Sequence, residues 1–263
     1  MDIFAFNPAE ALSLLLTLTR VSLLVFLLPV FGGNGAPAVL KGAICLALTV
    51  AIWPQVSFPG EAMPAHPFGL MLVVVGELVL GLMFSLVIRF TFAGIQAGGH
   101  ILAFQMGFSM AMVADPLQGE QETLLSHFLY TVALLTFLVL NGHLYVLKAL
   151  MDSFAIIPPG GLVLSPPLLG EVISMSAQIF VLGLKVAAPV LAALFLVELA
   201  LALMARAAPQ MNLLIIGFPL KIAIGLFFLG MLFMLMAEHI HGFIIDVVPL
   251  IGNLLRAASP MGS

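Results

Sequence analysis

Long runs of apolar residues, separated by short clusters of glycine and proline, dominate the pattern of this chain. A helix that spans a membrane needs about 20 mostly apolar residues, and several of the runs reach that length. The clusters of glycine and proline between the runs mark turns. The pattern predicts six helices, at 8–30, 37–53, 68–94, 122–152, 168–206 and 211–243.

Two of these predicted helices, 68–94 and 168–206, are too long for a simple crossing. At about 1.5 Å per residue they exceed a hydrocarbon thickness of about 30 Å, so each has to tilt, kink or project from the membrane. Pro189 is expected to kink the second of them, because an interior proline removes a backbone hydrogen bond. Gly217 and Pro219 are expected to interrupt the last helix. The last two helices therefore predict a C-terminal helical hairpin with paired breaks.

The composition indicates an integral membrane protein. Of the 263 residues, 63% are hydrophobic and only 8% are charged, whereas a soluble domain averages about 25% charged residues. The mean hydropathy is +1.26. The net charge of −4 is thinly spread, which excludes the basic patch of a nucleic-acid-binding protein. The predicted fold class is all-α, with about six long, kinked hydrophobic helices.

The segment 94–122, GIQAGGHILAFQMGFSMAMVADPLQGEQE, is apolar but rich in glycine. Irregular backbone is not tolerated in lipid, so a segment too broken for a clean helix must lie against protein or line a cavity. We therefore expect an internal, re-entrant loop between the third and fourth helices. Gly94 and Gly98 have the spacing that permits close contact between helices, although this motif is common by chance.

Sulfur and aromatic side chains are clustered within this segment, at Met106, Phe108, Met110 and Met112. Methionine is flexible and fills irregular gaps, so the cluster can be ordinary packing. It can also form a deformable seal, because hydrophobic constrictions close pores by excluding water. The glycine content and the Asp115-Pro116 turn that follows favour the seal.

Five charged residues lie inside the apolar helices, namely Arg20, Glu77, Lys185, Glu198 and Lys221. A charge at the centre of a bilayer costs roughly 2.5–3.5 kcal/mol on insertion scales, so such residues face protein or water and pair with one another. They can line a path for ions or protons, or they can form buried pairs that fix the register of the helices. The near balance of signs favours pairing, and a neighbouring subunit can also supply a counter-charge.

The chain carries no motif that indicates catalysis or a bound cofactor. The nucleophile motif Gly-x-Ser-x-Gly, the zinc motif His-Glu-x-x-His and the phosphate-binding loop are all missing from the sequence. His239 and His241 are the only close pair of histidines, and at this spacing on a helix they point to different sides. We therefore expect no enzymatic activity, no cofactor and no metal site.

Three stretches of the sequence resemble the FliR family of flagellar export-gate proteins, whose counterparts in virulence secretion systems form the SctT family. They are FQMGFSMAMVADPLQG at 104–119, FLVLNGHLYVLKALMDSFAIIPPG at 137–160, and the stretch 184–226. The third stretch is the most specific, because Ala-Pro-Gln-Met-Asn is followed there by Gly-Phe-Pro-Leu-Lys. The resemblance extends over essentially the whole chain.

The resemblance implies a structural subunit of a type III protein export gate. Such a subunit forms the secretion pore with FliP-like and FliQ-like subunits, with an FlhB-like subunit as a further partner and unfolded flagellar proteins as the cargo. Residues 1–167 would form a FliP-like part and residues 168–263 a FliQ-like helical hairpin. The gate would lie in the bacterial inner membrane at the flagellar basal body, displaced toward the periplasm.

Two other functions stay open at this point. One is the gate of a virulence secretion system, the injectisome. The other is a secondary transporter of small solutes or protons, since transporters also use broken helices with embedded charges.

In the family, the loop that corresponds to 104–119 projects into the channel and plugs it. The resemblance assigns this role to Met106, Gly107, Phe108, Ser109, Met110, Met112, Asp115 and Pro116. The residue types suit the role, because glycines permit turns and methionine and phenylalanine pack a deformable seal.

Overall fold

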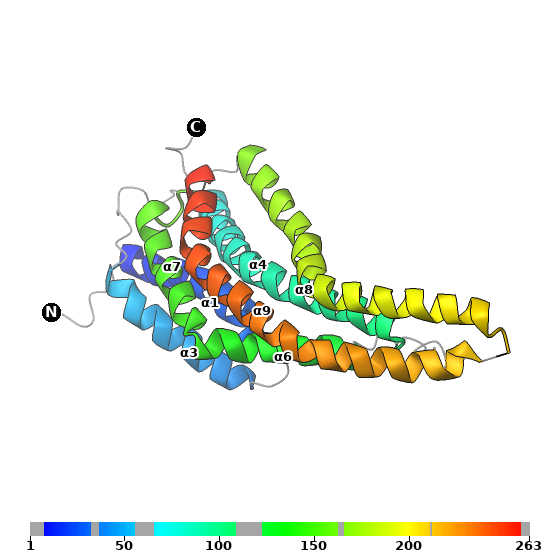
Figure 1. The fold of residues 1–263 in the computed structure, drawn as a ribbon. Helices are drawn as coiled ribbons and strands as arrows, with labels where there is room; N and C mark the ends of the chain where they lie inside the picture. The colour runs from blue at the N-terminus through cyan, green and yellow to red at the C-terminus, as the bar shows by residue number, and fades with distance from the viewer. Residues whose placement is uncertain are drawn as a thin grey trace. The chain divides into compact units, whose positions relative to one another are not determined.

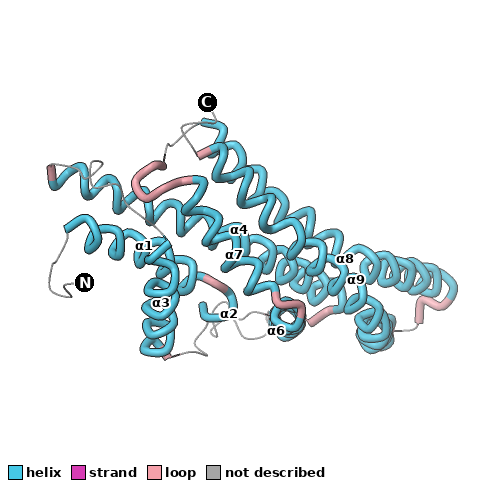
Figure 2. The backbone as a smooth tube through the Cα atoms, turned by 90° about the vertical axis from the view of Figure 1, so that its left-hand side faces the viewer, coloured by secondary structure: helices cyan, strands magenta, loops and turns pink. Residues whose placement is uncertain are grey.

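Helices make up nearly all of the structure, a computed structural model that describes residues 8–32, 37–55, 66–108, 123–162, 166–210 and 212–258 (Figure 1). Every regular element among these residues is a helix, and Figure 2 shows helices along most of the described backbone. The predicted all-α class is therefore confirmed.

The helices differ widely in length. In chain order they are α1 (Pro8–Leu27), α2 (Pro29–Gly32), α3 (Ala38–Ile52), the 3-10 helix η1 (Trp53–Gln55), α4 (Pro67–Met106), α6 (Leu124–Val139), α7 (Gly142–Ile156), α8 (Pro166–Ala207) and α9 (Leu213–Ala257). In the described part of the chain, α1, α4, α8 and α9 are long and apolar enough to span a membrane. The pair α6 and α7, bent by 68°, can form one further span. The described residues thus form four or five helical segments able to span a membrane, somewhat fewer than the six long hydrophobic helices predicted, as in a multi-pass membrane protein.

The chain divides into two compact units. Unit 1 consists of Met1–Arg89, Asn141–Met175 and Ile244–Ser263, and unit 2 consists of Phe90–Leu140 and Ser176–Phe243. Each of the long helices α4, α8 and α9 therefore contributes one part to each unit. The predicted division at 167/168 concerns likeness to other subunits rather than packing, and it stays a prediction.

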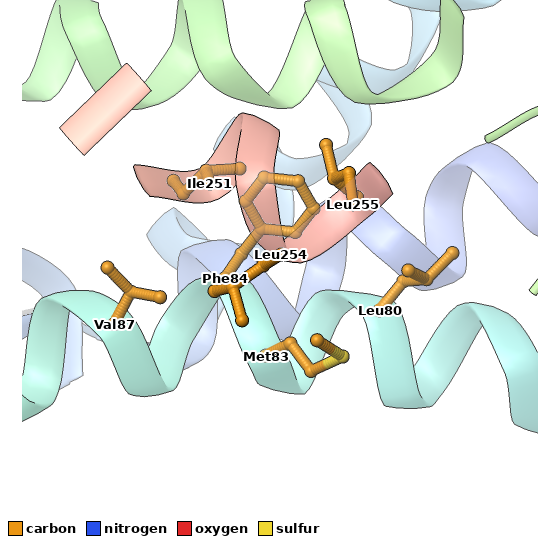
Figure 3. A pocket seen from close by; sticks show the side chains of 7 residues that line it. All are labelled: Leu80, Met83, Phe84, Val87, Ile251, Leu254 and Leu255. Atoms are coloured by element: carbon orange, nitrogen blue, oxygen red, sulfur yellow. The ribbon is translucent and has the colours of Figure 1, made fainter. Parts of the chain in front are cut away.

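In unit 1, the first part of α4 packs against the last part of α9. Figure 3 shows their side chains around a small apolar cavity of about 10 Å³. The cavity is lined by Leu80, Met83, Phe84 and Val87 of α4 and by Ile251, Leu254 and Leu255 of α9. A space this small and apolar offers a water molecule no hydrogen-bond partner, so the two helix segments are close to fully packed.

This packing explains why α9 is longer than predicted. The predicted helix ended at residue 243, but α9 continues to Ala257. Ile244, Val247 and Ile251 are buried at intervals of three and four residues, so the apolar face of the helix extends into the core of unit 1.

The structure also corrects the predicted interruption of the last helix at Gly217 and Pro219, because α9 is continuous through both. A Cβ atom on Gly217 would lie 3.2 Å from Cδ1 of Leu201, so the glycine provides space for α8 rather than a break. Pro219 lies near the start of α9, where it removes a single backbone hydrogen bond. Likewise α8 continues through Pro189, and the kink expected there stays a prediction.

The third predicted helix ended at Gly94, and this prediction is wrong because α4 continues to Met106. The glycines that suggested a loop instead lie where neighbouring helices approach closely. A Cβ atom on Gly98 would lie 2.8 Å from the carbonyl oxygen of Gly183, and one on Gly99 would lie 2.6 Å from Cα of Ser126. The close helix contact expected for Gly94 and Gly98 is therefore confirmed, whereas the loop reading of 94–106 is not.

The fourth predicted helix, 122–152, is two helices in the structure. Asn141 separates them and has a φ of 58°, in the left-handed region that ends a helix. The N–H of Leu140 donates to the carbonyl of Thr136, and that of Leu144 donates to the carbonyl of Asn141, so the helical hydrogen bonds stop and restart here. The Asn-Gly pair at this position is a turn signal that the long apolar run concealed.

Candidate functional site

The C-terminal end of α4 carries the first three residues of the predicted plug. The N–H of Gly107 donates to the carbonyl of Phe104 at 3.1 Å, and the N–H of Phe108 donates to the carbonyl of Ala103 at 3.0 Å. Gly107 has a φ of 91°. This combination is the Schellman motif, which satisfies the last carbonyl groups of a helix and favours glycine at the left-handed position.

An aromatic ring of α9 lies directly against this glycine. A Cβ atom on Gly107 would be 2.6 Å from Cδ1 and 2.7 Å from Cε1 of Phe218. Any side chain at position 107 would therefore collide with the ring as well as strain the backbone. The chain thus leaves α4 against the ring of Phe218, at a position whose backbone and surroundings strongly favour glycine.

The side chain of Met106 packs against Gly225 of α9. This side chain is fully buried, and a Cβ atom on Gly225 would lie 2.5 Å from Cε and 2.7 Å from Sδ of Met106. The methionine therefore lies across the bare backbone of Gly225. Phe108, two residues later, is 36% exposed.

Only part of the predicted plug falls within the described structure. Ser109, Met110, Met112, Asp115 and Pro116 lie outside the described residues. Their role in a plug therefore stays a prediction. Among the three that are described, Met106 and Gly107 are held by α9, and Phe108 is half exposed.

Two of the five embedded charges, Arg20 of α1 and Glu77 of α4, form a buried ion pair in unit 1. Nε of Arg20 donates to Oε2 of Glu77 at 2.6 Å, and Nη2 donates to Oε1 at 3.0 Å. Both residues have an exposed fraction of 0%. The pair has the two-pronged geometry that makes arginine–carboxylate interactions strong and specific.

Groups from α7 and the turn after it complete the shell around this pair. Nη1 of Arg20 donates to Oγ of Ser153 at 3.1 Å and to the carbonyl of Ile157 at 3.2 Å. The N–H of Gly160 donates to Oε1 of Glu77 at 3.0 Å. The guanidinium also lies 4.2 Å from the centroid of the Phe154 ring. The cluster therefore joins α1, α4 and α7 through charges whose hydrogen bonds are satisfied, as a buried ion pair requires.

The other embedded charges lie in unit 2. Lys221 of α9 donates to Oε1 of Glu198 on α8, and the two side chains are 20% and 39% exposed. Lys185 of α8 is exposed, and no ion-pair partner is found for it within the described ranges. The structure thus brings four of the five charges together in two pairs and leaves Lys185 outside both.

The described residues contain no group of three or more His, Cys, Asp or Glu side chains that could hold a metal ion. Sequence reasoning missed Phe218 and Gly225, although both lie in a stretch that it singled out. An isolated glycine inside an apolar helix often marks a close packing contact, and Gly225 carried that signal.

Comparison with known proteins supplies the family. The model of the family "Bacterial export proteins, family 1" matches residues 11–246. The flagellar biosynthetic protein FliR of Escherichia coli is 30% identical over 238 residues, which cover 90% of each chain. FliR of Bacillus subtilis is 34% identical over 216 residues, covering 80% of this chain and 82% of the relative. The chain therefore belongs to family 1 of the bacterial export proteins, the FliR family.

Proposed function

We propose that this chain is a structural subunit of the flagellar type III protein export gate in the bacterial inner membrane. In this proposal it forms the secretion pore with FliP-like and FliQ-like subunits, next to an FlhB-like subunit, and unfolded flagellar proteins pass through. Family membership over nearly the whole chain is the observation that carries the proposal. The 1–167 and 168–263 parts would correspond to a FliP-like part and a FliQ-like hairpin.

The native mass of the detergent-extracted complex tests this assignment. The chain is co-expressed with FliP-like and FliQ-like subunits, and we expect one copy of it in a large hetero-oligomer. A stable monomer or homodimer that ignores these subunits would instead favour a transporter. Restoration of swimming motility in a flagellar strain that lacks its own FliR separates a flagellar gate from a virulence gate.

We further propose that the segment 104–119 contributes the plug that closes the pore. The support lies in its methionine and phenylalanine content, in the turn motif at Gly107, and in the half-exposed Phe108 next to it. Hydrophobic constrictions exclude water, and flexible methionine side chains can part for a polypeptide and close again.

Deletion of residues 109–116 tests the plug while leaving Met106, Gly107 and Phe108 in place. We expect the complex to assemble with an unchanged native mass and to become leaky to ions when reconstituted in liposomes. A deletion of the same length at 56–63, outside the predicted plug, serves as the control and should not leak. An assembled 109–116 deletion that neither leaks nor alters secretion would remove the plug assignment.

Lys185 offers a test of the subunit role. This lysine is exposed on α8 between the exposed apolar residues Val181 and Leu184 and the exposed Ala188. A charge on an apolar face in a membrane is costly unless a counter-charge lies nearby, so we propose that a neighbouring subunit provides a carboxylate. Lys185→Ala should lower the recovery of the assembled gate, whereas Gln178→Ala, at another exposed position of α8, should not. Equal recovery of both variants would speak against an intersubunit pair.

A further inference from the structure

We propose that Met106, Gly107, Phe218 and Gly225 form an anchor that fixes the point at which the chain leaves α4. Two contacts with α9 hold consecutive residues, so any movement of the segment that follows begins after Gly107. The inference deepens the proposed plug function. It rests on that function only in the experiments that measure leakage; thiol labelling and crosslinking test the anchor by itself. It assigns Met106 to the support of the segment rather than to the sealing surface.

The first contact is between Met106 and Gly225, where the methionine occupies the space beside the glycine that a larger side chain would fill. An added Cβ atom on Gly225 would lie 2.5 Å from Cε, 2.7 Å from Sδ and 2.9 Å from Cγ of Met106. These distances place most of the methionine side chain over the glycine backbone. Because the side chain is fully buried, Met106 faces α9 and its surroundings, not an open channel.

The second contact is the ring of Phe218 on Gly107. The left-handed φ of 91° and the two hydrogen bonds back to Phe104 and Ala103 set the direction in which the chain leaves the helix. The ring, within 2.7 Å of the position of a Cβ atom, closes the space on that side of the glycine. The turn is therefore fixed both by its own hydrogen bonds and by α9.

Both contacts come from one side of α9. Phe218 and Gly225 are seven residues apart, which places them on the same face of the helix two turns apart. Lys221 lies between them and is paired with Glu198 of α8, which holds this part of α9 against α8. Two contacts on one supported helix prevent the end of α4 from rotating about either of them.

A size-swap experiment tests the first contact. Phe108→Cys, in a chain whose single cysteine is replaced by Cys45→Ala, reports the accessibility of position 108 to a thiol reagent in the assembled complex. Gly225→Leu displaces Met106, so we expect labelling at position 108 to rise several-fold. Met106→Ala alone should also raise it, and the double variant Met106→Ala with Gly225→Leu should return labelling to the rate of the Phe108→Cys parent, because the new leucine occupies the vacated space.

Gly230→Leu is the matched control, since nothing lies within 4 Å of a Cβ atom at this position of the same helix. It should leave labelling unchanged. If Gly225→Leu does not assemble, Gly225→Ala tests the same contact with a single added methyl group. Unchanged labelling in the assembled Gly225 variants, or no recovery in the double variant, would overturn the anchor.

A disulfide tests whether the anchor stays closed during transport. In the Cys45→Ala background, the variant Met106→Cys with Gly225→Cys is oxidised to form a disulfide, since an added Cβ atom on Gly225 would lie 2.9 Å from Cγ of Met106. We expect the oxidised protein to secrete as well as the reduced one, because movement begins after Gly107. Failure of the pair to crosslink, or a block of secretion that a reductant reverses, would overturn the proposal.

The two readouts separate the anchor from the plug. Faster labelling of position 108 without leakage would support the anchor and contradict the plug. Faster labelling together with leakage supports both. Leakage with unchanged labelling would overturn the anchor while leaving the plug intact.

Discussion

Unit 1 and unit 2 are built from parts of the same long helices, but different groups lie between those helices. In unit 1, the fully buried Arg20 and Glu77 join α1, α4 and α7 through a satisfied network of hydrogen bonds. In unit 2, Gly98 and Gly183 let the backbones of α4 and α8 meet, and the ion pair there is partly exposed. A buried charged cluster thus joins helices in unit 1, in addition to a close glycine contact at Gly81, whereas the contact of α4 with α8 in unit 2 depends on the absence of side chains.

This difference determines which changes each unit tolerates. A buried charge has to keep its partner, because removal of one member leaves the other without solvent or counter-charge. A close contact at a glycine involves no charged group, and it is disrupted when a larger side chain replaces the glycine. Unit 1 should therefore be most sensitive to loss of a polar group, and unit 2 to gain of an apolar one.

The largest effect is expected from Glu77→Ala in unit 1. It leaves the guanidinium of Arg20 buried and unpaired, which typically costs about 3–5 kcal/mol. The yield and thermal stability of the detergent-extracted protein should fall sharply, while removal of the exposed carboxylate in Glu171→Ala should change little. Replacement of both partners, Arg20→Met with Glu77→Leu, should recover much of the lost stability. Wild-type stability of Glu77→Ala would show that the cluster does not hold unit 1 together.

An intermediate effect is expected from Gly98→Val in unit 2. The new side chain would meet the carbonyl oxygen of Gly183, 2.8 Å from the position of Cβ, so α4 and α8 would have to separate. Overpacking of this kind typically costs about 1–3 kcal/mol. The melting temperature in detergent measures the effect, and Gly230→Val provides the control because its Cβ atom meets nothing. Equal melting temperatures for the two variants would show that the close contact of Gly98 with Gly183 does not make unit 2 sensitive to added volume.

The smallest effect is expected from Lys221→Met. The pair with Glu198 is partly exposed, and such pairs contribute about 0–1 kcal/mol. The variant should fold with nearly wild-type stability and with a weaker dependence of stability on salt. A loss as large as that of Glu77→Ala would show that the Glu198 pair is as desolvated in the assembly as the pair in unit 1.

Much of the fold could be predicted from local pattern. The apolar runs located the starts of α1, α4 and α8 to within two residues, because burial in lipid or protein requires long apolar stretches whatever the partner is. Composition gave the all-helical membrane class, and three sequence stretches indicated the family that the comparisons confirm. The five embedded charges were also visible in the sequence, since a charge in an apolar helix is rare.

Only the tertiary structure decided what the ambiguous residues do. Glycine occurs both in loops and in close helix contacts, and the sequence alone does not distinguish the two. Gly94 and Gly98 therefore suggested a break where α4 in fact continues. The partner of Arg20 is 57 residues away in sequence, and no local pattern encodes such a pair. The roles of Met106 and Gly225 likewise depend on what lies opposite each of them. Local preference is set by the residue itself, whereas pairing and close packing are set by the geometry between helices.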